Sequence, residues 1–353
     1  MSSHAAPIAA ASANAPVVSP LADPSYPRLV ADIGGTHARF GWLAQPGAPL
    51  AHVTKLAAAD YPGPAEAVQA YLAMLGPLTG VAVAPPRRAA IAVATAVDGD
   101  VVRFTNSAWH FSRQAVQAAL GLDSLLLLND FEALALSLPC LTPAQRRCLG
   151  AEAPRSAGTL AVVGPGTGLG VGAVVATRSG WVALPGEGGH ATLAPADDLE
   201  SELLAVVRRQ HAHVSAERLL SGIGLPVLHQ ALGVVTGRPV AEPWTAEAIV
   251  AEGVPARDAL ASETLDLFCA LLGGFAGNVV LTLGARSGLY IGGGIVPRLG
   301  ERFFQSAFRA RFEAKGRFQA YLQAVPTALI TDTHAALAGA ALAIAQQFQA
   351  ERG

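Results

Sequence analysis

Two short segments with glycine and threonine have the composition of phosphate-binding turns. Asp32-Ile33-Gly34-Gly35-Thr36 follows one apolar run, and Gly164-Pro165-Gly166-Thr167-Gly168 follows another. Glycine at such a turn lets backbone N–H groups reach phosphate oxygens without a Cβ in the way. The Asp32 carboxylate cannot bind phosphate, but it can hold Mg²⁺ directly or through water. Both segments could instead be ordinary tight hairpins. The recurrence of the Gly-Thr pattern favours phosphate binding.

Asn129 and Asp130 lie between a leucine-rich run at Ser124–Leu128 and a helical segment. Ligands of open α/β sheets gather at the carboxyl ends of strands, so these two side chains occupy a favourable position. An aspartate there is ionised at neutral pH and can accept a proton from an alcohol. Both residue types are also common helix N-caps, and the local sequence leaves that alternative open.

Two further segments contain carboxylates that could bind a neutral ligand. Glu187 and His190 share a glycine-rich loop, which suits a polar pocket where they hydrogen-bond a polyol. A flexible surface loop is the alternative. Glu217 follows Ser215, a possible helix cap, so a solvated helix carboxylate is the simpler local interpretation. We do not expect zinc at His190, because no cysteine cluster lies near it.

The elements that must position these residues alternate between strands and helices. Apolar runs predict two glycine-tipped hairpins, a third hairpin over 89–105, a parallel strand at Ser124–Leu128 and a strand at Gly288–Gly294. Helices are expected at 112–120, 131–138, 198–211, 215–221, 225–232, 257–283 and 335–348. The pattern predicts an α/β protein in which two similar hairpins each open a lobe.

The composition excludes several classes of protein. Of the 353 residues, 52% are hydrophobic and only 14% are charged, so the chain can bury ample apolar surface. Its 24 Lys+Arg and 26 Asp+Glu residues form no basic block, so we expect no nucleic-acid partner. Three cysteines without a CxxC pair fit a reduced, cytoplasmic setting. Segment 267–285 is uncharged, but its apolar residues recur at helical spacing, which predicts a helix buried in protein and no membrane partner.

Together these segments resemble the bacterial ATP-dependent glucokinases, which belong to the superfamily of sugar kinases, actin and heat-shock ATPases. The resemblance covers about residues 28–345 and rests on segments 29–42, 104–112, 127–139, 162–172, 184–195, 213–225 and 291–299. It implies a fold class: α/β, with two lobes of duplicated actin-like, ribonuclease-H-like topology around a central cleft. A homodimer is also implied. The cysteine-rich zinc motif of the repressor-related sugar kinases is absent, which points to the zinc-free branch.

The resemblance also implies a role for each candidate residue. The site would bind ATP and Mg²⁺, with Asp32 as the metal ligand. Positions implied to bind ATP are Ala31, Asp32, Ile33, Gly34, Gly35, Thr36, Gly164, Gly166, Thr167, Gly168, Gly292, Gly293 and Gly294. Positions implied to bind glucose are Asn129, Asp130, Glu187, His190 and Glu217, with Asp130 as general base. Two positions depart from the family pattern: His37 stands where Asn is common, and Ala96 where Pro is frequent.

The domain organisation follows from the same resemblance. We expect a disordered Ala/Pro/Ser-rich tail over 1–27, a small lobe formed by 28–140 with 330–353, and a large lobe formed by 141–329. The tail lacks the features of a signal peptide.

The expected function is phosphorylation of D-glucose at its 6-hydroxyl. The alternatives are a kinase of another hexose, a non-catalytic sugar-sensing protein, and a chaperone- or actin-like nucleotide switch.

Overall fold

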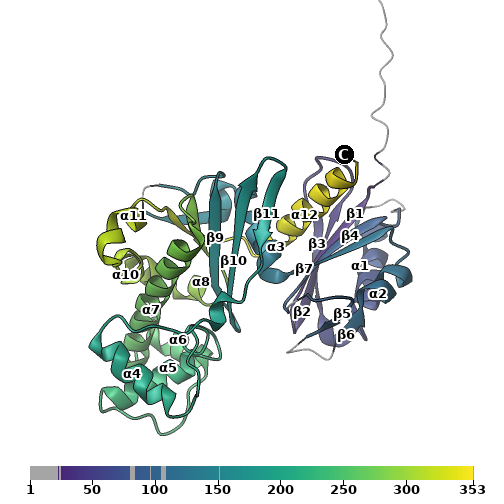
Figure 1. Cartoon of the computed structure of the whole chain (residues 1–353). Coiled ribbons are helices and arrows are strands. Elements are labelled where there is room, and N and C mark those ends of the chain that lie inside the picture. Colours follow the sequence, from purple (N-terminus) through teal and green to yellow (C-terminus); the bar gives the residue numbers. More distant parts are fainter. Residues whose placement is uncertain are drawn as a thin grey trace, which may run out of the picture.

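The computed structural model describes residues 23, 25–79, 84–95, 97–104, 109–150 and 152–352 (Figure 1). Ala96 and the central part of segment 104–112, residues 105–108, lie outside the described residues. Two β-sheets organise the chain, and each is built on one of the glycine-tipped hairpins.

The first sheet contains the hairpin that carries Asp32. Its strands are β1 (Arg28–Ile33), β2 (His37–Leu43), β3 (Ala51–Ala57), β4 (Arg88–Val93) and β7 (Ser124–Asn129). They lie in the order β3-β2-β1-β4-β7; β1, β2 and β3 pair antiparallel, whereas β4 and β7 continue the sheet in parallel. Helices α1 (Pro64–Thr79) and α2 (Arg113–Ala119) pack on one face through Tyr71, Leu75 and Val116.

The predicted hairpin over 89–105 is wrong. β4 lies between β1 and β7 and is buried along nearly its whole length, as a central parallel strand must be. Its sequence neighbour β5 (Val101–Arg103) pairs with β6 (His110–Ser112) in a separate two-stranded ribbon. The apolar pattern identified both strands, but it could not identify their partners.

The second sheet repeats the design of the first. Its strands are β8 (Arg146–Leu149), β9 (Thr159–Pro165), β10 (Leu169–Thr177), β11 (Gly180–Leu184), β12 (Gly288–Ile291) and β13 (Thr327–Ile330). The order is β11-β10-β9-β12-β13-β8. In both sheets, three antiparallel strands are followed by two strands parallel to the first, in the spatial order third, second, first, fourth, fifth. The predicted duplication is confirmed, with β8 as an additional edge strand.

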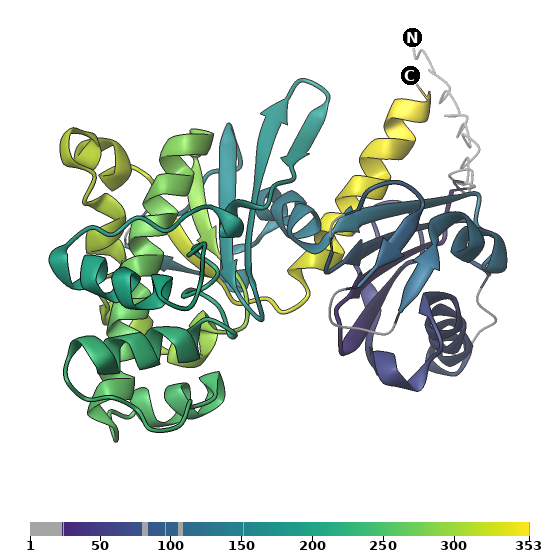
Figure 2. The ribbon, with the colours of Figure 1, turned by 60° about the horizontal axis from the view of Figure 1, so that its bottom comes forward.

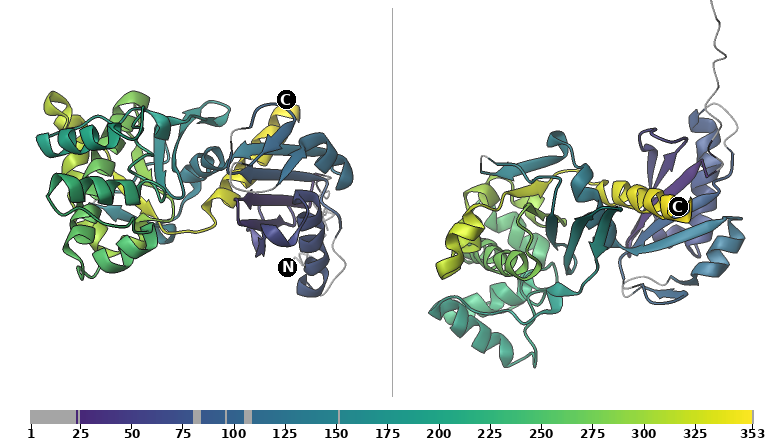
Figure 3. Two further views of the ribbon diagram at one scale, coloured as in Figure 1. Left: turned by 90° about the horizontal axis from the view of Figure 1, so that it is seen from below. Right: turned by 45° about the horizontal axis from the view of Figure 1, so that its top comes forward.

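Two helices lie between the sheets and connect them (Figures 2 and 3). α3 (Asp130–Ser137) follows the last strand of the first sheet but packs on β10 of the second. α12 (Ala335–Arg352) follows β13 and returns to pack on β4 and β1, as predicted for the C-terminal helix. The two helices touch closely, because a Cβ added at Gly339 would lie 1.7 Å from the carbonyl oxygen of Ala133.

Helices occupy most of the chain between β11 and β13 and lie on the side of the second sheet away from the first (Figure 1). They are α4 (Asp198–Arg208), α5 (Leu225–Val235), α6 (Ala246–Gly253), α7 (Ala259–Leu283), α8 (Val296–Leu299), α9 (Glu301–Gln305), α10 (Phe308–Glu313) and α11 (Gln319–Gln323). By length and composition α7 could cross a membrane, but 72% of its apolar window is buried inside the protein. It packs against α10 and β9, as expected for a core helix. The sequence analysis predicted neither α6 nor α8–α11.

Two sequence-based predictions need correction. Residues 215–221 form turns rather than a helix, and Ser215 pairs with Thr192 in an isolated β-bridge. The expected tail also ends too late, because Ser25 is only 3% exposed and its hydroxyl accepts a hydrogen bond of 2.7 Å from Arg28. We propose the other domain boundaries as the sequence predicts them. The small lobe contains the first sheet and the large lobe the second, and the chain passes from one lobe to the other near residues 140 and 330.

Candidate active site

The tip of the first hairpin places Asp32 opposite a cation. Asp32 pairs with Arg39 in the antiparallel register, and their side chains form an ion pair of 3.3 Å. Burial raises the pKa of Asp32, and the neighbouring guanidinium of Arg39 partly offsets this rise. The turn itself is closed by a hydrogen bond of 2.9 Å from the Gly34 N–H to the His37 carbonyl. The tip thus combines one poorly solvated carboxylate with a glycine turn.

Asn129 and Asp130 form the N-terminus of α3, at the carboxyl end of β7. Asn129 is the N-cap: its side-chain oxygen accepts from Phe131 N at 2.9 Å and Glu132 N at 3.3 Å, while its amide donates to the Thr95 carbonyl. Asn129 therefore caps α3, and its implied contact with glucose stays a prediction. Asp130 occupies the first helical position, and its Oδ1 also accepts from Phe131 N at 2.9 Å.

The environment of Asp130 makes its carboxylate unusually basic. Its pKa is raised to about 6, chiefly by burial and further by the negative charges of Asp32 and Glu187. The hydrogen bond from Phe131 N acts in the opposite direction. A carboxylate with a pKa near 6 is mostly ionised at neutral pH, yet it is a much better proton acceptor than an ordinary aspartate.

The second glycine hairpin is held by two other segments of the chain. The Gly222 N–H donates to the Gly166 carbonyl at 2.8 Å, and the Ile295 N–H donates to the Pro165 carbonyl at 3.2 Å. Gly293 has a φ of +76°, and a Cβ added there would lie 2.3 Å from the Pro165 oxygen. Only glycine permits both this conformation and this approach. The loop Gly292–Gly294 is therefore packed directly on the hairpin.

Glu187 and His190 share one loop, and Glu217 from another loop lies beside them. His190 Nε2 is 3.9 Å from Glu187 Oε2, and its Nδ1 is 3.9 Å from Glu217 Oε1. Glu187 and His190 are exposed, whereas the Glu217 side chain is only 21% exposed. Glu217 also accepts a hydrogen bond of 2.8 Å from the N–H of Leu169 at the second hairpin. The solvated-carboxylate alternative is therefore wrong for Glu217.

A cavity of about 480 Å³ joins several of these residues. Its lining includes Asp32, Asp130 and Gly292–Gly294, which sequence reasoning had placed in one site. It also includes residues that the sequence analysis missed: Arg39, Phe131, Leu134, Pro297, Arg298, Ile330–Thr333, Ala335 and Ala336. Arg39 could have been found from the hairpin register opposite Asp32. The loop before α12 carried no comparable signal, because β13 itself was not predicted.

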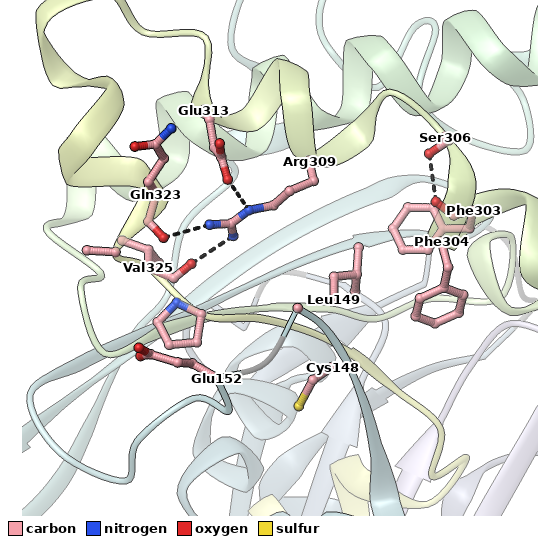
Figure 4. Close-up of a pocket in the computed structure, with 13 residues that line it drawn as sticks. Cys148, Leu149, Glu152, Phe303, Phe304, Ser306, Arg309, Glu313, Gln323 and Val325 are labelled. Carbon is pink, nitrogen blue, oxygen red and sulfur yellow. Dashed lines mark hydrogen bonds and ion pairs between the residues drawn. The ribbon is translucent and has the colours of Figure 1, made fainter.

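A second cavity, of about 570 Å³, lies apart from these residues beside β8, α9 and α10 (Figure 4). Its arginine is fully engaged within the protein: Arg309 donates to Glu313, to the Val325 carbonyl at 2.8 Å and to the Gln323 carbonyl at 2.9 Å. These bonds tie α10 to the chain segment before β13. Arg309 therefore stabilises the fold, and the cavity contains none of the candidate site residues.

The residues around Asp32 fit a magnesium ion that is held mainly by a nucleotide. Among the described residues, no group of three or more His, Cys, Asp and Glu side chains forms a metal cluster. Mg²⁺ typically binds one or two carboxylates together with water and substrate phosphates. Asp32 and Asp130 are mutually repelling carboxylates in one cavity, which is the charge arrangement that a cation relieves.

Comparison with known proteins decides the family. Residues 29–347 match the sequence model of the glucokinase family. The chain belongs to the glucokinase family. It is 47% identical to a glucokinase of Aromatoleum aromaticum, over 93% of this chain and 98% of that protein. The crystal structure of a glucokinase from an Antarctic psychrotroph superposes with a TM-score of 0.82 at 35% identity, covering 90% of this chain and 98% of the other. The two-lobed, actin-like fold predicted from the sequence is thus confirmed.

Other relatives of this glucokinase-family chain are longer. The bifunctional protein glk of Burkholderia thailandensis is 46% identical over 327 residues, which cover 93% of this chain but 50% of the relative. The chain thus spans about half the length of that protein and of similar bifunctional relatives.

Proposed function

We propose that the protein transfers the γ-phosphoryl group of ATP to the 6-hydroxyl of D-glucose, with Asp130 as the general base. Membership of the glucokinase family supports this reaction. The observation that carries the proposal is the placement of Asp130, whose pKa is raised to about 6, in the same cavity as Asp32 and the glycine loop 292–294. This arrangement supports Asp130 as a proton acceptor beside the proposed phosphate-binding loop.

In the proposed mechanism, Asp130 takes the proton of the sugar 6-hydroxyl while that oxygen attacks the γ-phosphorus in line. The new O–P bond forms as the bond to the β,γ-bridging oxygen breaks, and ADP leaves. Glu187, His190 and Glu217 hold the other sugar hydroxyls, while Asn129 fixes the start of α3. Backbone N–H groups of the two hairpins bind the phosphates. Asp32 would hold Mg²⁺ directly or through water, and the bound ion would supply charge neutralisation at the phosphoryl oxygens.

A coupled assay with a panel of sugars and phosphoryl donors tests this proposal. The panel contains glucose, mannose, fructose and N-acetylglucosamine, each with ATP or polyphosphate and with Mg²⁺ or EDTA. We expect the highest kcat/KM with glucose and ATP, and loss of activity in EDTA. Preference for another hexose would overturn the assignment of glucose. Glucose binding by calorimetry without any turnover would instead identify a sugar-sensing protein.

Two finer features complete the proposal. We expect a homodimer, which light scattering of the purified protein would detect as twice the chain mass of 36.0 kDa. We also expect a cytoplasmic location, because the three cysteines are free and one of them, Cys269, is buried in a core helix. Fractionation of cells that express the complete protein would test the location.

A further inference from the structure

We propose that Phe131 is a positioning residue: its ring rests on a glycine surface of the second hairpin and thereby fixes Asp130 relative to the phosphate-binding turn. The inference rests on the proposed function. The glycine surface consists of Gly164 on β9 with Gly170 and Gly172 on β10, and we call it the glycine seat.

The glycine seat is shaped for this one ring. Gly164 and Gly170 are directly opposite each other in the antiparallel register, and Gly172 lies on the same face as Gly170. A Cβ at Gly170 would lie 2.0–2.2 Å from three atoms of the Phe131 ring, and one at Gly164 would lie 2.5 Å from the ring. Glycine weakens a strand interior, so three glycines on one face mark a site of close approach.

The backbone of Phe131 is held by the same contact. A Cβ at Gly172 would lie 2.7 Å from the carbonyl oxygen of Phe131, so backbone and ring both lie directly on β10. The N–H of Phe131 donates to Asp130 Oδ1 at 2.9 Å and to the Asn129 side chain at 2.9 Å. The position of the Phe131 backbone therefore determines where the Asp130 carboxylate is held.

The other end of this connection is the phosphate-binding turn. Gly164 precedes the Gly166–Gly168 tip by two residues, and Gly170 follows it by two. The hairpin tip is in turn bonded to Gly222 and to Glu217, by way of Leu169. The ring thus links α3, which begins on the first sheet, to a rigid hairpin of the second. Phe131 also lines the cavity that contains Asp32 and Asp130.

Steady-state kinetics of Phe131→Ala and Phe131→Leu test the inference. Misplacement of a reacting group by about 1 Å can reduce the rate roughly 100-fold, so we expect kcat of Phe131→Ala to fall about 10- to 100-fold. The glucose KM should change less than about threefold, because Glu187, His190 and Glu217 lie on segments other than α3. Phe131→Leu keeps an apolar side chain and should lose less. Thermal unfolding establishes that each variant is folded at the assay temperature; if Phe131→Ala is not, Phe131→Leu carries the test.

Gly170→Ala provides the complementary test. Its methyl group displaces the ring, so kcat should fall as it does in Phe131→Ala. In the double variant the ring is absent, the methyl group has room, and kcat should be no lower than in Phe131→Ala alone. Gly274→Ala on α7 is the matched control, because no atom lies within 4 Å of an added Cβ there. Its kcat should equal that of the unaltered protein.

The outcomes separate this inference from the proposed function. Normal kcat in the folded Phe131 variants, or losses that simply multiply in the double variant, would overturn the positioning role while the kinase assignment stands. An unaltered protein that transfers no phosphoryl group to any sugar would overturn both.

Discussion

The two glycine hairpins share one pattern in the sequence, but they differ in what surrounds them. The first bears Asp32 and its partner Arg39, and a Cβ added at Gly34 would meet only the His37 carbonyl oxygen at 3.6 Å, an ordinary contact. The second bears no charged side chain at its tip, and the segments around Gly222, Gly293 and Phe131 pack closely against it. The first hairpin therefore supplies charge, whereas the second supplies a rigid surface.

This difference shows how a duplicated unit can divide the work of one site. Phosphoryl transfer depends on charge neutralisation and on exact placement of the reacting atoms. The first sheet provides the two interacting carboxylates, Asp32 and Asp130. The second sheet provides the support against which α3 and the proposed sugar-binding loops are held. Each of the following predictions tests one side of that division.

The largest effect should come from the charged side. Asp130→Asn keeps the shape of the side chain and can still accept the hydrogen bond from Phe131 N, but an amide cannot take the hydroxyl proton. We expect kcat to fall roughly 10²- to 10⁴-fold, the usual worth of a general base. Glucose affinity, measured by calorimetry, should fall far less. Near-normal kcat would show that Asp130 only forms the start of α3. It would contradict a catalytic role for the carboxylates of the first sheet.

A smaller effect should distinguish the two hairpins in stability. Gly293→Ala combines a positive φ with a contact of 2.3 Å to a backbone oxygen, so it should lower the free energy of unfolding by about 2–4 kcal/mol. The methyl group of Gly34→Ala makes only an ordinary van der Waals contact, so this variant should change the free energy of unfolding by less than about 0.5 kcal/mol. Urea unfolding of both variants measures the difference. Equal losses would show that the second hairpin is no more constrained than the first.

The basicity of Asp130 should also be visible in stability. A carboxyl group whose folded-state pKa is raised stabilises the protein at low pH and loses that contribution as pH rises through about 6. Asp130→Asn does not titrate, so at pH 8 it should be more stable than the unaltered protein by on the order of 1–3 kcal/mol. The advantage should disappear below about pH 4. A variant that is less stable than the unaltered protein at pH 8 would contradict the claim that the ionised Asp130 carboxylate destabilises the fold.

The smallest effect concerns the charge coupling between Asp32 and Asp130. The negative charge of Asp32 contributes to the raised pKa of Asp130, so Asp32→Asn should lower the pKa of Asp130. The acid limb of glucose turnover should then move to lower pH, even if the overall rate falls through weaker magnesium binding. An unmoved limb would show that burial alone sets the pKa.

The sequence was informative where the relevant contacts are local. Apolar runs and glycine tips predicted both hairpins, and the Ser124–Leu128 run predicted the strand that ends at Asn129. The partners of β4 could not be predicted, because they come from distant segments of the chain. The turns around Glu217 were mistaken for a helix, because the bonds that hold them run to Gly189 and Leu169 in other segments. The glycine seat was invisible for the same reason, although its three glycines are plain in the sequence.

The dependence of kcat/KM on pH tests the central claim most directly. Measured for glucose between about pH 4.5 and 8.5, with ATP and Mg²⁺ saturating, it reports the ionisation of the essential base in the enzyme that has bound ATP and Mg²⁺ but not yet glucose. For the unaltered protein we predict a plateau at neutral pH and an approximately tenfold fall for each unit below about pH 6, where Asp130 becomes protonated. The residual activity of Asp130→Asn should lack this limb. A profile of the unaltered protein that stays flat down to about pH 4.5, or a limb that survives in Asp130→Asn, would contradict the assignment of Asp130 as the base.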